Sequence, residues 1–155
     1  QNDFSGQIFV PYEIINEKKN ITNLGNFLKN SDDFSLNKFN LRIHPLNMKS
    51  KKHENFKKNI QKLLTIYKNK FSKKKINKIS IVFGSVTGIT VQALESGVEV
   101  IHFPNDHRID VFNEVMWPNI KIKNFGGVYS YTLKKKNMNF WVKQKKPNFE
   151  KCFKL

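Results

Sequence analysis

Short apolar runs alternate with longer amphipathic stretches along most of the chain. The apolar runs have the length of strands, and they lie at residues 7–10, 39–43, 79–83 and 98–103. The amphipathic stretches predict helices at residues 20–30, 56–71 and 89–96, the clearest being 56–71, where apolar residues recur at steps of three and four. This alternation predicts an α/β domain in which helices cover a mostly parallel sheet.

The pattern weakens after the fourth apolar run. Residues 106–117 are predicted to form a helix, residues 121–122 a short strand and residues 128–133 a last strand. Beyond these the chain is rich in lysine and shows no clear period. We therefore predict one Rossmann-like, three-layer domain over residues 1–133, followed by a basic C-terminal extension over residues 134–155.

The net charge of +16 is unevenly distributed. Residues 49–78 hold twelve lysines and residues 134–155 hold eight, each against a single glutamate, whereas residues 79–133 carry a net charge of −2. Such an excess is typical of proteins that bind polyanions. Arginine, which suits forked contacts with phosphates and bases, occurs only at Arg42 and Arg108, so nucleic acid is a disfavoured partner. The lysines indicate either a solvated helix face or attraction to an anionic membrane surface.

Cysteine content and hydropathy indicate a cellular location. The single cysteine, Cys152, cannot form a disulfide within the chain, and no apolar run reaches the roughly 20 residues of a membrane-spanning helix. We therefore expect a cytoplasmic protein, with the lysine clusters as a route to the inner surface of the membrane. Gln1 is neither an initiator methionine nor part of a signal-peptide pattern, so we expect the chain to be one part of a longer protein.

A glycine-bracketed turn follows the third apolar run and opens the next helix. Its chemistry comes from Gly84, Ser85, Thr87 and Gly88. A helix N-terminus presents unpaired N–H groups and a partial positive charge, glycine allows close approach, and the two hydroxyls add donors, so the turn is a candidate anion site. The alternative is that a hydroxyl merely caps the helix. The turn has neither the Walker nor the GxGxxG spacing.

His44 ends the second apolar run and is followed by Pro45. Because parallel strands bring their carboxyl ends to one edge of a sheet, we expect His44 to lie on the same edge as the turn, where it can donate to a phosphate. A purely structural histidine is the alternative. Asp106, His107 and Asp110 either border the same cleft or cap a helix.

No metal site or set of catalytic residues is predicted. The spacing of His102, His107 and the nearby aspartates matches no standard ligand pattern, and no serine or cysteine has partners for nucleophilic catalysis.

The stretch GSVTGITVQALESGVEVIHFP, residues 84–104, resembles the strand, phosphate turn, helix and strand of the C-terminal, donor-binding domain of GT-B glycosyltransferases. The Arg-Ile-His-Pro sequence at residues 42–45 is similar to the His-Pro motif of bacterial sialyltransferases and capsule polysaccharide transferases. The resemblance covers residues 39–103 best. It implies that His44, Ser85 and Thr87 contact the phosphate of a nucleotide-sugar donor.

The resemblance also implies a function. Many members of the class bind the ribose through a glutamate in the helix after the turn, and Gln92 occupies that position here. The implied activity is metal-independent glycosyl transfer, needing no cofactor besides the nucleotide-sugar donor, to a carbohydrate or lipid-linked acceptor in surface polysaccharide or glycolipid synthesis. The catalytic base would lie in an acceptor domain that this chain lacks. Alternatives are a sugar-nucleotide epimerase, a polyol-phosphate transferase, a relative without activity, and a basic nucleic-acid-binding module.

Overall fold

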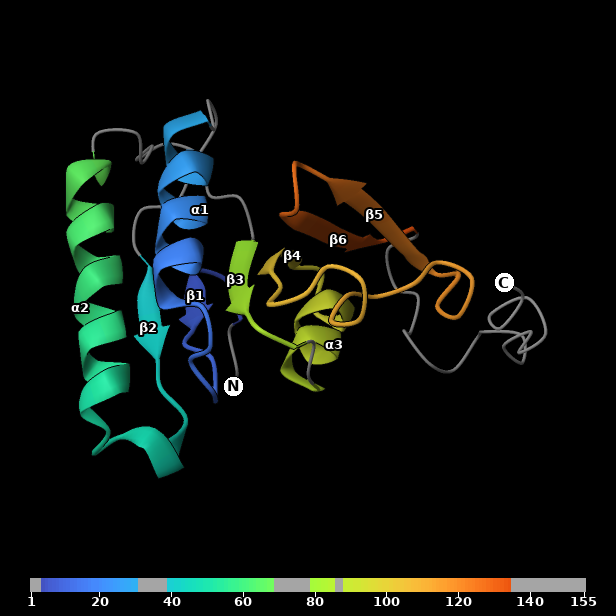
Figure 1. The fold of residues 1–155 in the computed structure, drawn as a ribbon. Coiled ribbons are helices and arrows are strands. Elements are labelled where there is room, and N and C mark those ends of the chain that lie inside the picture. Colours follow the sequence, from blue (N-terminus) through green and yellow to red (C-terminus); the bar gives the residue numbers. More distant parts are fainter. Residues whose placement is uncertain (1–3, 31–38, 69–78, 86–87, 135–155) are drawn as a thin grey trace.

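The computed structural model describes residues 4–30, 39–68, 79–85 and 88–134, which form a sheet with helices on both faces (Figure 1). The strands are β1 (Gln7–Phe9), β2 (Asn40–Arg42), β3 (Ile79–Phe83), β4 (Glu99–Phe103), β5 (Ile120–Asn124) and β6 (Tyr129–Leu133). The helices are α1 (Glu17–Asn30), α2 (Lys51–Ile66) and α3 (Gly88–Glu95), with a short 3-10 turn, η1 (Pro45–Asn47), between β2 and α2. The predicted α/β class is confirmed.

The six strands lie in the order β2-β1-β3-β4-β6-β5. The first four are parallel, and β5 and β6 form an antiparallel hairpin beside β4. The chain passes from β1 to β2 on one side and then returns to β3 on the other side of β1. Loops after β1 and β3 therefore diverge at the carboxyl edge, which is where open α/β sheets bind ligands.

Alternation along β3 divides the core into two layers. Ile81 and Phe83 face α1 and α2, and Val82 faces α3. On the first face, Phe83 stacks on Phe103 at 5.1 Å between ring centroids and meets the edge of Phe56 at 5.3 Å. These aromatic contacts attach α2 to the end of β3 that borders the carboxyl edge.

The predicted helix at residues 106–117 is wrong. The segment forms turns, in which the Asp106 carboxylate accepts the N–H of Arg108 and the Asn113 amide oxygen accepts the N–H of Val115. Such side chains compete with the helical hydrogen bonds of the backbone.

Two other predicted elements differ in extent. The predicted strand at 121–122 extends over all of β5 because it pairs with β6, and the lysine-rich helix begins at Lys51, where Ser50 caps it. Residues 69–78 and 135–155, which include most of the predicted basic extension, lie outside the described residues.

Candidate functional site

A hollow of about 420 Å³ lies at the carboxyl edge of β1, β2 and β3. It brings together His44, Gly84 and Ser85, which the sequence predicted to share this edge. Its other polar or charged lining residues are Tyr12, Glu13, Arg42 and Asn105. Residues far apart in the sequence thus form one site because three parallel strands end side by side.

The backbone beside His44 determines which nitrogen of its ring carries the proton. It precedes η1, and its Nδ1 accepts the backbone N–H of Leu46 at 3.1 Å. A backbone N–H can only donate, so Nδ1 carries no proton and the neutral ring keeps its proton on Nε2. The ring packs edge-on against Tyr12 at 5.0 Å between centroids. His44 can therefore donate a hydrogen bond to an anion without becoming charged.

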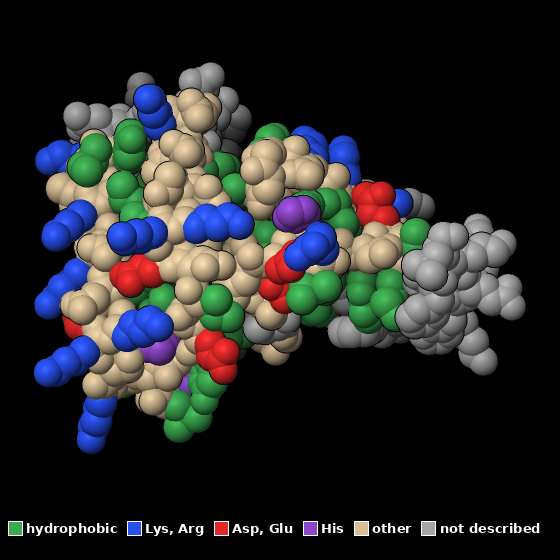
Figure 2. All heavy atoms as spheres, in the orientation of Figure 1, with side chains coloured by type: hydrophobic (Ala, Val, Ile, Leu, Met, Phe, Trp, Pro, Cys, Tyr) green, Lys and Arg blue, Asp and Glu red, His purple; other side chains and the backbone are tan. Residues whose placement is uncertain are grey.

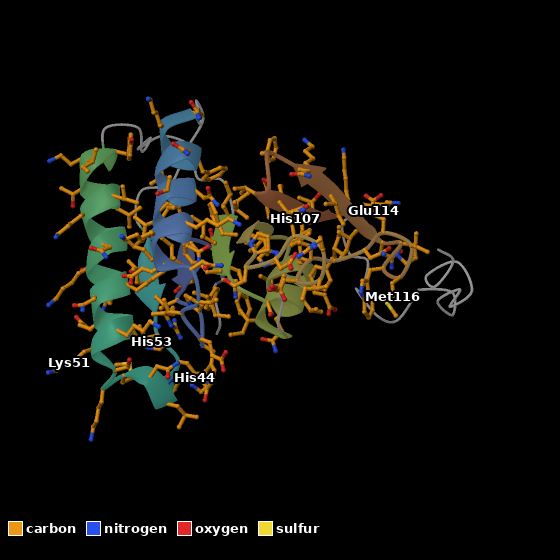
Figure 3. All side chains as sticks on the ribbon, viewed as in Figure 1. His44, Lys51, His53, His107, Glu114 and Met116 are labelled. Carbon is orange, nitrogen blue, oxygen red and sulfur yellow. The ribbon has the colours of Figure 1, made fainter. Side chains whose placement is uncertain are left out.

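A second histidine, His53, ties the two loops around His44 together (Figure 3). The carbonyl of Tyr12, in the loop after β1, accepts from His53 Nε2 at 2.8 Å and from Asn47 Nδ2 at 3.0 Å. His53 Nδ1 in turn lies 2.7 Å from the hydroxyl of Ser50, the cap of α2. No local sequence pattern indicates this role, because the spacing of Ser50 and His53 predicts only a helix cap and Tyr12 is distant in sequence.

Gly84 shapes the turn rather than supplying a donor to it. Its φ of +82° lies in the region that side chains disfavour, and its N–H donates to the carbonyl of Phe103 at 2.9 Å. Its own carbonyl accepts from Nε2 of His102. The N–H groups open to an anion must therefore come from residues after Gly84.

A buried chain of hydrogen bonds supports this carbonyl. His102 is fully buried, and its Nδ1 lies 2.8 Å from the hydroxyl of Tyr131, whose oxygen accepts the N–H of Phe112 at 3.4 Å. Each group has one consistent role if His102 is neutral and donates from Nε2 to Gly84. Burial lowers the pKa of His102 to about 4 and raises the pKa of Tyr131, so both remain uncharged near neutral pH.

The hydroxyl of Ser85 is engaged by an acidic neighbour. It donates to Oδ1 of Asp110 at 3.0 Å, while Oδ2 of Asp110 accepts the N–H of Asp106 at 3.0 Å. Asp106 itself pairs with Arg108 at 3.0 Å, and this guanidinium lowers the pKa of Asp106 to about 2. Asp110 does not itself line the hollow, but its contact with Ser85 puts a negative charge next to the candidate anion turn.

The remaining predicted residues lie differently. Thr87 is outside the described residues. Gly88 begins α3, and no atom lies within 4 Å of the position that a Cβ there would take. Gln92 is exposed on α3 and does not line the hollow. His107 is exposed and does not line it either.

Two lining residues, Glu13 and Asn105, had no role in the sequence interpretation. Glu13 is exposed in the loop after β1 and is the only carboxylate among the described residues of the hollow. Asn105 follows β4, and its Oδ1 is buried with no hydrogen-bond partner in the described part of the chain. The sequence pattern does not indicate either residue, because each lies in a loop and the course of that loop places it at the hollow.

Within the described ranges, no group of three or more histidine, cysteine, aspartate or glutamate side chains could hold a metal ion. Over the same ranges, no helix combines the length and apolar character needed to cross a membrane. In comparisons with known proteins, no family model matches the sequence, and no curated protein or solved structure matches it significantly.

The buried His102 makes stability depend on pH. Its pKa falls from 6.5 to about 4 on folding, so the unfolded chain binds more protons in this interval and stability is lost as the pH drops through it. The full shift corresponds to about 3 kcal/mol. Urea unfolding at pH 7 and pH 4.5 should show a larger loss for the unmodified chain than for His102→Gln, which has no imidazole to protonate.

His107→Gln is the matched control for this measurement, because His107 is exposed. It should keep the pH dependence of the unmodified chain. An equal pH dependence in His102→Gln and the unmodified chain would show that His102 is not held neutral by burial.

Proposed function

We propose that this chain is the Rossmann-like, donor-binding part of a glycosyltransferase that makes a surface polysaccharide or glycolipid. The observation that carries the proposal is the hollow at the reversal in strand order, which His44 and the Gly84–Ser85 turn line from separate strands. Both belong to the motifs that resemble GT-B donor domains. A nucleotide phosphate suits the hollow because His44, Arg42 and Ser85, which can all donate hydrogen bonds to an anion, line it.

The proposed chemistry is stabilisation of a leaving nucleotide. When an acceptor hydroxyl attacks the donor sugar, negative charge grows on the departing phosphate. Nε2–H of His44, the guanidinium of Arg42 and N–H groups at the start of α3 would meet that charge, each hydrogen bond contributing about 1.5–3 kcal/mol. This route needs no metal ion. The resemblance assigns the base to a separate acceptor domain, so we expect this chain alone to bind nucleotide without turnover.

The ribose has two candidate partners. Gln92 is the residue that the resemblance implies, but it lies outside the described hollow. Glu13 lies within the hollow, and a carboxylate accepts hydrogen bonds from vicinal hydroxyls more strongly than an amide does. We therefore favour Glu13 for the ribose.

Calorimetric titration with CMP, UDP, GDP and CDP tests the donor site. We expect one nucleotide to bind, and we expect His44→Ala and Ser85→Ala each to weaken it roughly tenfold to a hundredfold, as for loss of a hydrogen bond to a charged group. Matched controls are His107→Ala and Ser96→Ala, whose side chains are exposed and do not line the hollow. No binding of any nucleotide, or equal weakening by the controls, would contradict the proposal.

Substitution of Asp110 is expected to strengthen nucleotide binding, unlike substitution of His44 or Ser85. Because its carboxylate holds the Ser85 hydroxyl, it competes with a phosphate for the same donor and repels it. A like charge at contact distance costs about 1 kcal/mol even in water. Asp110→Asn should therefore tighten binding of the nucleotide roughly fivefold in the same titration, and weaker binding would place Asp110 among the groups that hold the ligand.

The assignment of the ribose is tested with the 2′-deoxy form of the nucleotide that binds. We expect the unmodified chain and Gln92→Ala to prefer the ribonucleotide, and Glu13→Gln to lose much of that preference. Loss of the preference in Gln92→Ala alone would return the role to Gln92.

A further inference from the structure

The connection between β2 and α2 carries two large apolar side chains that project from the protein. Leu46, in η1, is 76% exposed, and Met48, just after it, is 63% exposed. Figure 2 shows hydrophobic side chains protruding at the end of the molecule where α2 begins. Transfer of two such side chains, close together on one short turn, from water to an apolar phase would be favourable.

Lysines follow this apolar pair. Lys49, Lys51 and Lys52 are exposed, and one acidic residue, Glu54, lies with Lys51 and Lys52 in the first turn of α2. Two of them, Lys51 and Lys52, are in the first turn of α2, where the helix dipole disfavours positive charge. Helix stability therefore does not explain their position. Further lysines continue along the exposed side of α2 (Figure 2).

We propose that this turn docks on an anionic phospholipid bilayer. Leu46 and Met48 enter the boundary between headgroups and acyl chains, and the three lysines contact anionic headgroups. The combination favours a bilayer over a nucleic acid, because a polyanion in water receives charge but offers no hydrocarbon layer for exposed aliphatic side chains. Neither the apolar pair nor the lysines alone would bind firmly, since stable attachment to a membrane takes two signals.

Docking at this turn would bring the mouth of the hollow to the membrane surface. Pro45 begins η1 and also lines the hollow, as do the exposed residues Tyr12 and Ile15 in the loop after β1. An acceptor that reaches the hollow from a bilayer must itself be anchored there. The acceptor is therefore a lipid-linked glycan, an inference that rests on the proposed function, whereas the docking itself does not.

Vesicle sedimentation tests the docking. We expect the full chain to pellet with vesicles of phosphatidylcholine and phosphatidylglycerol, but not with phosphatidylcholine alone. Lys51→Gln/Lys52→Gln should weaken binding roughly tenfold or more, as for loss of two lysines near an anionic surface. Leu46→Ser/Met48→Ser should also weaken it, and the binding that remains should be more sensitive to salt because only the electrostatic part is left.

The opposite edge of the sheet provides matched controls. Lys121→Gln/Lys123→Gln on β5 and Phe125→Ser after it remove exposed side chains of the same kinds, and they should leave vesicle binding unchanged. Equal binding to neutral and anionic vesicles, or equal losses in the controls, would overturn the proposal. The proposal would also be overturned if the lysine variant lost vesicle binding and the apolar variant did not. That result would indicate that the lysines bind a polyanion in water.

Nucleotide titration without vesicles separates the two proposals. Vesicle binding without nucleotide binding would leave the docking intact and remove the donor site and the lipid-linked acceptor. Nucleotide binding without vesicle binding would overturn the docking and the lipid-linked acceptor inferred from it, and would leave the donor site intact.

Discussion

The candidate site depends on how one residue, Gly84, is held where β3 ends. Its N–H donates to the carbonyl of Phe103 in β4, and its carbonyl accepts from the buried His102. His102 is hydrogen-bonded to Tyr131, whose hydroxyl oxygen accepts the N–H of Phe112. The chain then has to leave the sheet in a conformation that glycine tolerates. Both backbone polar groups of Gly84 are thus satisfied within the protein, and the next residue, Ser85, lines the hollow.

The opposite wall of the hollow depends on a different polar contact. The Tyr12 carbonyl accepts from Asn47, in the connection between β2 and α2, and from His53 in α2, so the loops after two neighbouring strands are joined as one unit. His44 stands on that unit, with its tautomer fixed by the backbone of Leu46. The candidate site is therefore supported by two buried histidines, His53 on one wall and His102 on the other, whereas His44, which lines the hollow, is exposed.

Sequence patterns predicted the parts of this fold that local periodicity controls. The continuous apolar runs of β3 and β4 and the short α3 between them were found within a residue, and parallel pairing predicted that His44 and Ser85 would share an edge. Roles that depend on partners distant in sequence were not predictable. The residues next to His53 and His102 in sequence do not indicate the contacts that these histidines make. The segment after β4 has the apolar spacing of a helix, but its aspartate and asparagine side chains bond to the backbone and compete with helical hydrogen bonds.

The bond between Ser85 and Asp110 keeps a carboxylate beside the candidate anion turn. A ligand that uses the Ser85 hydroxyl must exchange with a carboxylate tethered to the same protein, whose effective concentration does not fall on dilution. The same carboxylate would recapture the hydroxyl once the ligand begins to leave, which shortens residence time without any movement of a lid. The same contact would therefore lower the affinity for an anion and speed its exchange.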